Sequence, residues 1–139
     1  MTKIIDIQNT ANCHLYHDVN RMMIAVIWKP APLTDRIYKE TFNTAIRYQE
    51  NYPVNIPNYM ADVRLQPPIS VELRKWFTDE TLQRGIYAGI KRAGFVVNAN
   101  ILKRYYMNQI MNSLKKFGIP FKFFKNHSDV LNWVDSQMH

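Results

Sequence analysis

Four short apolar runs, separated by longer amphipathic stretches, constrain the fold of this chain more than any other feature. The runs cover residues 22–28, 59–65, 93–98 and 121–124. Between them, apolar residues recur three and four positions apart, which is the spacing of an amphipathic helix. Strands that are joined through helices pair in parallel with right-handed crossovers. The sequence therefore predicts a largely parallel sheet that is covered by helices.

A β-hairpin precedes the first crossover. Residues 14–18 and 22–28 are two strands in this interpretation, and residues 19–21 form the turn between them. The second strand, MIAVIW after Met22, is rich in the β-branched and aromatic residues of a buried strand. An exposed edge strand of the hairpin could pair with a second copy of the chain, so a homodimer is one expected assembly.

Capping residues and prolines mark where the helices begin and end. Thr34 is a predicted N-cap of a helix that stops before Pro53. Pro67 and Pro68 end the strand at 59–65, because proline has no amide hydrogen for the sheet. Ser70 is then a predicted N-cap of the helix that begins VELRKWF.

Three further helical stretches follow, at residues 79–88, at 101–117 and at the end of the chain. Gly118 is the expected C′ residue of the second stretch, with Pro120 just beyond it. The last helix can cover a sheet face with Val130, Leu131, Trp133 and Val134. The predicted order is β-β-α-β-α-β-α-β-α. We expect one α/β domain over residues 1–139, with a mixed five-stranded sheet.

Length and composition agree with one domain, since 139 residues with 47% hydrophobic content can form a core. The single cysteine, Cys13, cannot form an internal disulfide. The first ten residues lack the basic and apolar regions of a signal peptide, and the best apolar run, residues 22–28, is far shorter than a membrane span. The expectation is a cytoplasmic protein without a transmembrane segment.

The net charge of +7 is unevenly placed along the chain. Residues 1–70 hold 7 basic and 6 acidic side chains, whereas residues 71–139 hold 11 basic and 5 acidic ones. A basic surface is typical of proteins that bind nucleic acid or anionic surfaces. The basic residues here come as pairs on four separate predicted elements rather than as one tract, which favours a solvated surface. Nucleic-acid binding is therefore the less expected interpretation.

Several stretches together resemble a known family. The entry into the first helix, KPAPLTDRIYKETF after Trp28, is followed by YMADVRL, by SVELRKWF, by the AGFVVN strand and by FFKNHSDVLNWV. This pattern resembles the SpoIIAA-like proteins, which are grouped with STAS and Sec14 (CRAL-TRIO-like) domains, and it is similar to uncharacterised bacterial members. The resemblance implies a five-stranded sheet and a non-enzymatic, regulatory role through protein–protein contact. More distant relatives hold lipids in an apolar cleft.

The regulatory serine of the anti-sigma-factor antagonists in this family lies in an Asp-Ser-Ser-Gly-Leu-Gly type motif, which this chain lacks. Asp62 ends a predicted strand, but the next serine is Ser70, after two prolines. Ser70 is interpreted as a helix N-cap, with a phosphorylatable switch as the alternative. Asp62 is expected to bind loop amides or to pair with Arg64 rather than to act as an acid or base.

Motifs that carry catalysis or metal binding are absent from the sequence. On a strand, Cys13 and His17 point to one face and His14 to the other, so the CHLYH stretch does not predict a three-ligand metal site. No glycine-rich phosphate loop, GxSxG or HExxH is present. We therefore expect no metal, no cofactor and no enzymatic activity.

The candidate site lies at the carboxyl ends of the parallel strands, where open α/β sheets bind ligands. Its candidate residues are Asp62, Arg64, Ser70, Trp76, Arg104, Tyr105 and Tyr106. Three functions remain open from the sequence. The first is a regulatory module that binds an unknown protein partner. The second is a carrier of a small apolar ligand or lipid, which requires a pocket of at least about 300 Å³. The third is binding of nucleic acid or an anionic surface through the basic second half.

Overall fold

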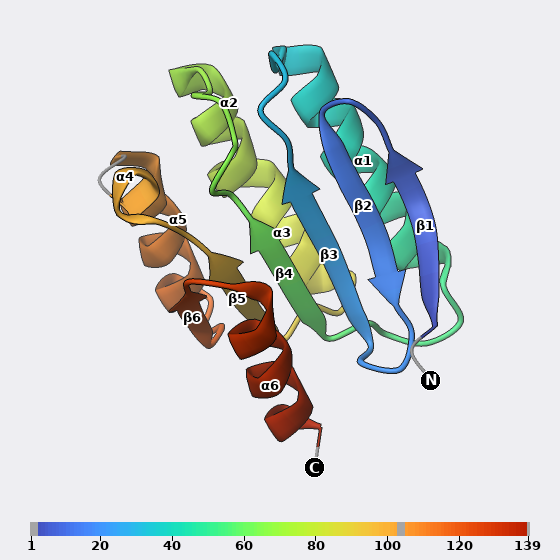
Figure 1. Ribbon diagram of the computed structural model, residues 1–139. Helices are drawn as coiled ribbons and strands as arrows, with labels where there is room; N and C mark the ends of the chain where they lie inside the picture. Colours follow the sequence, from blue (N-terminus) through green and yellow to red (C-terminus); the bar gives the residue numbers. More distant parts are fainter. Residues whose placement is uncertain (1–2, 103–104, 139) are drawn as a thin grey trace.

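The computed structural model describes residues 3–102 and 105–138 (Figure 1). These residues form one six-stranded sheet, in the order β1-β2-β3-β4-β5-β6. The strands are β1 Ile4–Asn9, β2 Cys13–Asp18, β3 Met23–Trp28, β4 Asn58–Asp62, β5 Arg92–Val96 and β6 Phe121–Phe124. The helical segments are α1 Asp35–Asn51, α2 Val71–Trp76, η1 Phe77–Thr81, α3 Leu82–Tyr87, α4 Ala99–Leu102, α5 Tyr105–Lys116 and α6 His127–Gln137.

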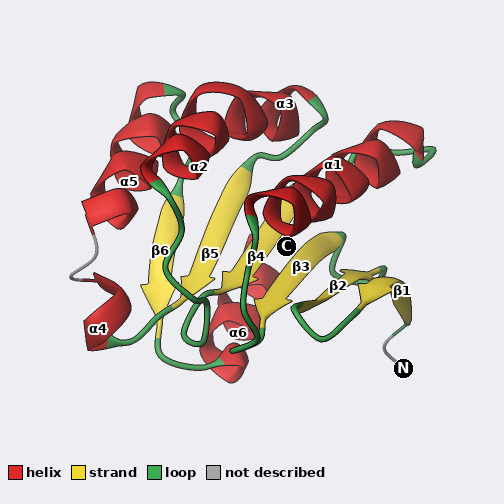
Figure 2. Ribbon diagram, turned by 90° about the horizontal axis from the view of Figure 1, so that it is seen from above, coloured by secondary structure: helices red, strands yellow, loops and turns green. Residues whose placement is uncertain are grey.

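The sheet is mixed, as the sequence predicts. β1, β2 and β3 form an antiparallel meander, and β3 through β6 pair in parallel. Each crossover advances one strand in the same direction, so α1, α2, α3 and α5 cover the same face (Figure 2). Of the helices in the described part of the chain, α6 lies against the opposite face (Figure 2). The sheet therefore separates two apolar cores.

The prediction of five strands is wrong, because β1 adds a sixth at the edge of the sheet. β1 pairs with β2, and the register shifts between Asp6 and Gln8. This irregularity interrupts the alternation of apolar residues: Ile7 packs against the main core, whereas Ile4 is exposed. Both strands of the predicted hairpin are therefore internal, and the open edge of the meander belongs to β1.

Several element boundaries also differ from the prediction: for example, the strand expected at 93–98 is β5, which ends at Val96. β4 ends at Asp62 rather than at Leu65, because the chain turns there: the Arg64 amide donates to Asp62 Oδ1, and Gln66 N donates to Val63 O. The helix expected over residues 101–117 corresponds to α4 and α5, and residues 103 and 104 between them lie outside the described residues.

The predicted caps are confirmed. The Thr34 hydroxyl accepts a hydrogen bond from Ile37 N at the start of α1, and the Ser70 hydroxyl accepts one from Leu73 N at the start of α2. Gly118 follows α5 with φ +69°, a conformation that glycine adopts without strain. The helix expected after Ser70 and the helical stretch expected at 79–88 form one continuous helical run. In this run α2, η1 and α3 follow one another directly, and η1 is a π-helical turn.

The larger core lies between the sheet and the helices α1, α2, α3 and α5. Trp28 stacks on Tyr38 with ring centroids 5.6 Å apart, and Phe42 and Phe77 continue the aromatic cluster at 5.0 Å from each other. The smaller core lies under α6. It consists of Met23, Ala25, Met60, Val96, Val130 and Val134. The prediction that α6 covers a sheet face through its apolar residues is confirmed.

Among the described residues, no helix combines the length and the apolar character that crossing a membrane requires.

Candidate functional site

Asp62 and Arg64 form an ion pair at the carboxyl end of β4. Asp62 Oδ1 accepts from the backbone amide and from Nε of Arg64, both at 3.1 Å, and Oδ2 accepts from Arg64 Nη2 at 2.8 Å. The Asp62 side chain is 7% exposed and that of Arg64 is 37% exposed. The pairing of these two candidate residues, as expected from the sequence, is present.

His127 completes this cluster from the other end of the chain. Its Nε2 donates to Asp62 Oδ2 at 2.7 Å. His127 is the first residue of α6, after the N-cap Asn126, whose side chain accepts from Asp129 N. The contact therefore ties the first turn of α6 to the end of β4. We call Asp62, Arg64 and His127 the carboxyl-edge clamp.

The electrostatics of the clamp keep Asp62 charged. Burial by itself would raise the pKa of Asp62, but the hydrogen bonds from Arg64 and His127 outweigh it and hold the pKa below its ordinary value of 3.8. Both carboxylate oxygens are occupied by these donors. Such a carboxylate orients a loop and a helix, and it is a poor general base.

The clamp also fixes the loop that follows β4. Arg64 Nη1 donates to the Lys125 carbonyl at 3.3 Å, and Asn98 Nδ2 donates to the Arg64 carbonyl at 3.3 Å. The loops after β4, β5 and β6 are therefore hydrogen-bonded to one another through Arg64.

The other candidate residues do not join the clamp. Ser70 contacts Leu73 N and lies 3.5 Å from Asp35 Oδ1. Trp76 packs edge-on against Tyr38, and Lys39 Nζ lies 5.6 Å from its ring centre. Both side chains thus belong to the α1 and α2 region, whereas the clamp involves α6. Arg104 and the side chains of Tyr105 and Tyr106 lie outside the described part of the structure.

Replacing Ser70 tests the cap against the alternative of a phosphorylation switch. Ser70→Ala should lower the free energy of unfolding by about 0.5–2 kcal/mol because the cap is lost. Ser70→Asp should change it by no more than about 1 kcal/mol, since aspartate also caps, although Asp35 is nearby. Thermal melts and pull-downs of both variants check this. A Ser70→Asp variant that folds like the parent but recovers different partners would support the switch.

Cys13 and His17 lie on the α1 face, and His14 lies on the other face, paired with Asp6 at 2.7 Å. Burial raises the pKa of the Cys13 thiol, which lies 3.9 Å from the Thr41 hydroxyl. Burial also lowers the pKa of His17, whose Nδ1 lies 2.8 Å from the Tyr48 hydroxyl. Within the described residues no group of three or more metal-binding side chains is present.

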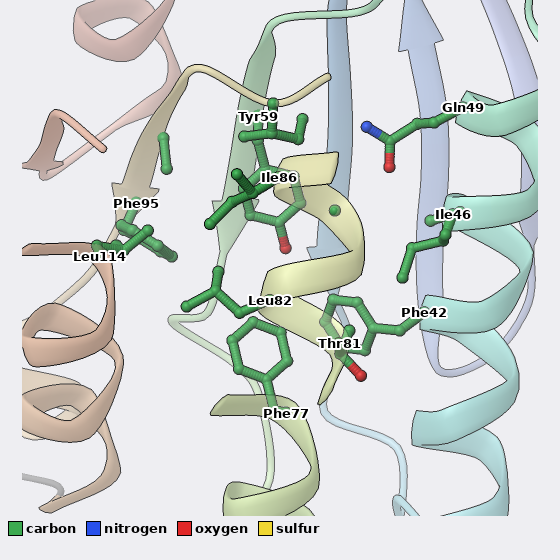
Figure 3. Close-up of a pocket in the computed structure, with 14 residues that line it drawn as sticks. Phe42, Ile46, Gln49, Tyr59, Phe77, Thr81, Leu82, Ile86, Phe95 and Leu114 are labelled. Carbon is green, nitrogen blue, oxygen red and sulfur yellow. The ribbon is translucent and has the colours of Figure 1, made fainter. Parts of the chain in front are cut away.

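A second feature, which the sequence analysis missed, is a cavity between α1, α3 and the sheet (Figure 3). Its volume is about 50 Å³. Gln49 reaches it from α1, Thr81 from η1 and Tyr59 from β4. The remaining lining residues are apolar: Phe42, Ala45, Ile46, Phe77, Leu82, Gly85, Ile86, Ile90, Ala93, Phe95 and Leu114.

Two polar atoms at this cavity lack hydrogen-bond partners among the described residues. Among the described residues, three buried side-chain atoms have no hydrogen-bond partner, and two of them, Gln49 Nε2 and Thr81 Oγ1, belong to its lining. Burial raises the pKa of Tyr59 far above its ordinary value, so its hydroxyl stays protonated. A sequence signal existed: Gln49 continues the apolar positions 42, 45 and 46 of α1 at helical spacing.

No family model matches this chain, and neither does any curated protein or any solved structure. The class of protein must therefore be inferred from the fold and from the clamp and cavity.

Proposed function

We propose that this chain is a non-catalytic, SpoIIAA-like regulatory module that binds an acidic protein partner through the loop after β4. The observation that carries the proposal is the exposure of Leu65, a residue that is 59% exposed on a loop that the carboxyl-edge clamp holds in place. Val71, at the start of α2, is 60% exposed. Apolar side chains on a rigid loop bind a partner at a low cost in conformational entropy.

The charges indicate the chemistry of the partner. The chain carries a net charge of +7, and the exposed Lys125 follows β6, where its carbonyl contacts Arg64. A partner with an apolar centre and an acidic rim complements this surface. The resemblance to SpoIIAA-like proteins favours the same role, and the occupied carboxylate of Asp62 and the buried thiol of Cys13 favour a binding role over catalysis.

The two alternative functions are less well supported. A cavity of about 50 Å³ is much smaller than the roughly 300 Å³ that a drug-sized or lipid ligand needs. The described pairs of basic residues lie on or beside α2, β5 and α5, so they do not form one basic tract. Arg92 is also engaged within the protein, since its Nη1 donates to Asn58 Oδ1 at 2.7 Å. Neither a lipid nor a nucleic acid is therefore the preferred ligand.

Substitution of Leu65 by aspartate should abolish partner capture without unfolding the protein. The introduced charge opposes both burial at an interface and contact with an acidic partner. Val54→Asp is the matched control, because Val54 is similarly exposed, at 56%, but lies between α1 and β4, away from the clamp. Quantitative pull-downs from the native host at low and high salt, together with melting temperatures, measure the effect.

The expected result is an acidic protein that the parent and Val54→Asp recover, that Leu65→Asp loses and that high salt releases. If the parent recovers no protein that Leu65→Asp loses, or if Val54→Asp loses the same protein, the proposed surface is wrong.

A further inference from the structure

The cavity between α1, α3 and the sheet has the chemical character of a small ligand site. Gln49 is 6% exposed and Thr81 is 3% exposed, yet Gln49 Nε2 and Thr81 Oγ1 have no hydrogen-bond partner. Folded proteins pair nearly all buried polar groups, so each exception requires an explanation. Two exceptions at one cavity, on different elements, indicate that a bound water or a ligand group supplies the missing hydrogen bonds there.

The lining determines the charge of such a group. None of the described residues that line the cavity carries a charged side chain, and most are aliphatic or aromatic. Transfer of an isolated ion into such surroundings is costly. Gln49 Nε2 can only donate a hydrogen bond. The fitting ligand is therefore uncharged, with an apolar end and an acceptor oxygen next to it.

The volume determines the size of the apolar end. About 50 Å³ has room for at most about four water-sized groups, at roughly 10–15 Å³ each. A compact, branched group of four carbons is therefore the largest apolar end that this space admits. Straight-chain lipids are too long for it.

The rest of the ligand has a place outside the cavity. An open, polar hollow of about 410 Å³ includes Gln49 in its wall, so Gln49 belongs to both spaces. The other residues of the hollow are Glu50, Tyr52, Asn55, Arg84, Tyr87 and Ala88. Tyr87 is 88% exposed. A ligand can therefore place its apolar end inside, its acceptor oxygen at Gln49 and a polar remainder in the hollow.

The inner wall includes a segment of unusual backbone. Phe77 and Thr81, the first and last residues of the π-helical turn η1, both line the cavity. π-helical turns occur frequently at functional sites. Gly85 also lines it, and a Cβ there would meet no heavy atom closer than 4.0 Å.

We propose that this cavity binds a small uncharged molecule with a branched four-carbon end and a carbonyl oxygen that accepts a hydrogen bond from Gln49. The amide of a short branched-chain acid belongs to this class. This binding is independent of the loop after β4, and Leu65→Asp leaves it unchanged.

The test is a titration with isovaleramide, followed by the methyl NMR signals of Ile46, Leu82 and Ile86. Saturable shifts are expected, with a dissociation constant on the order of 1 mM for a ligand of this size. Acetamide lacks the branched end and isovalerate carries a charge, so each should bind at least about tenfold more weakly. Absence of saturable shifts with isovaleramide, or equal binding of isovalerate, would overturn the proposal.

Three variants locate the site. Gln49→Leu should weaken isovaleramide binding about tenfold through loss of the hydrogen bond, and should melt no lower than the parent. Gln83→Leu is the matched control, because the Gln83 side chain lies on α3, donates to the Asp79 carbonyl and is not among the described residues that line the cavity. Ala93→Val fills the cavity from β5 and should abolish binding. Unchanged binding by Gln49→Leu, or a loss of binding by Gln83→Leu in a folded protein, would contradict the assignment.

Discussion

Replacement of Gly94 by alanine should lower the free energy of unfolding by about 1–3 kcal/mol, the usual cost of overpacking a core. Gly94 lies in β5 on the face that α6 covers. A Cβ at this position would lie 2.6 Å from Val130 Cγ2, a distance that real Cβ atoms do not show, and 3.4 Å from Phe124. Val130 is completely buried, so its methyl group cannot move aside into solvent. Glycine thus allows α6 to pack closely on the sheet.

Gly85→Ala is the matched control for this change. Gly85 lies in α3, and its added Cβ would approach no heavy atom closer than 4.0 Å. Because alanine favours helix over glycine by up to about 1 kcal/mol, this variant should be as stable as the parent or more so. A second test is the double variant that combines Gly94→Ala with Val130→Ala. Its loss in free energy of unfolding should be smaller than the sum of the losses of the two single variants. Urea denaturation of the parent, of the three single variants and of the double variant measures these differences. Additive costs, or equal effects of the two glycine substitutions, would show that close packing under α6 is not the cause.

The parallel part of the fold could be predicted because its strands are short apolar runs. The helices between these strands begin and end at recognisable capping residues. Ser70 and Thr34 cap helices where the sequence predicts them, and Gly118 ends α5. β1 was missed for a physical reason. Its bulge between Asp6 and Gln8 interrupts the two-residue period on which strand recognition depends. As an edge strand, β1 also has fewer buried residues than β2, β3, β4 or β5.

The candidate site was predictable only in its local part. Asp62 and Arg64 are two positions apart, so their pairing could be inferred from the strand end. His127 lies 65 positions further along the chain, and only the placement of α6 against the sheet brings it to Asp62. The cavity depends in the same way on how α1, α3 and the sheet come together. Its one local signal is Gln49 within the apolar face of α1, where a polar side chain is unusual.

Replacement of Asp62 by alanine should lower the free energy of unfolding at pH 7 by about 2–3 kcal/mol. The change removes charge-assisted hydrogen bonds to Arg64 and His127, which are worth more than neutral ones. The cost stays below the 3–5 kcal/mol typical of a fully buried pair, because the Arg64 and His127 side chains are 37% and 35% exposed and water can reach them. Asp135→Ala is the control. Asp135 also pairs with an arginine, Arg21, but is 46% exposed, so its loss should cost no more than about 1 kcal/mol.

The pH dependence of this difference is the sharper test of the carboxyl-edge clamp. The pKa of Asp62 is lower in the folded protein than its ordinary value of 3.8, so the folded state binds the proton less readily than the unfolded state does. The stabilisation by Asp62 is therefore fully present above about pH 4 and is lost as the pH falls through the folded pKa. In urea denaturation, the gap between the parent and Asp62→Ala should be present at pH 5 and should shrink below pH 4. A gap that stays constant down to pH 3 would mean that the carboxylate charge is not what holds the loop after β4 and the start of α6 together.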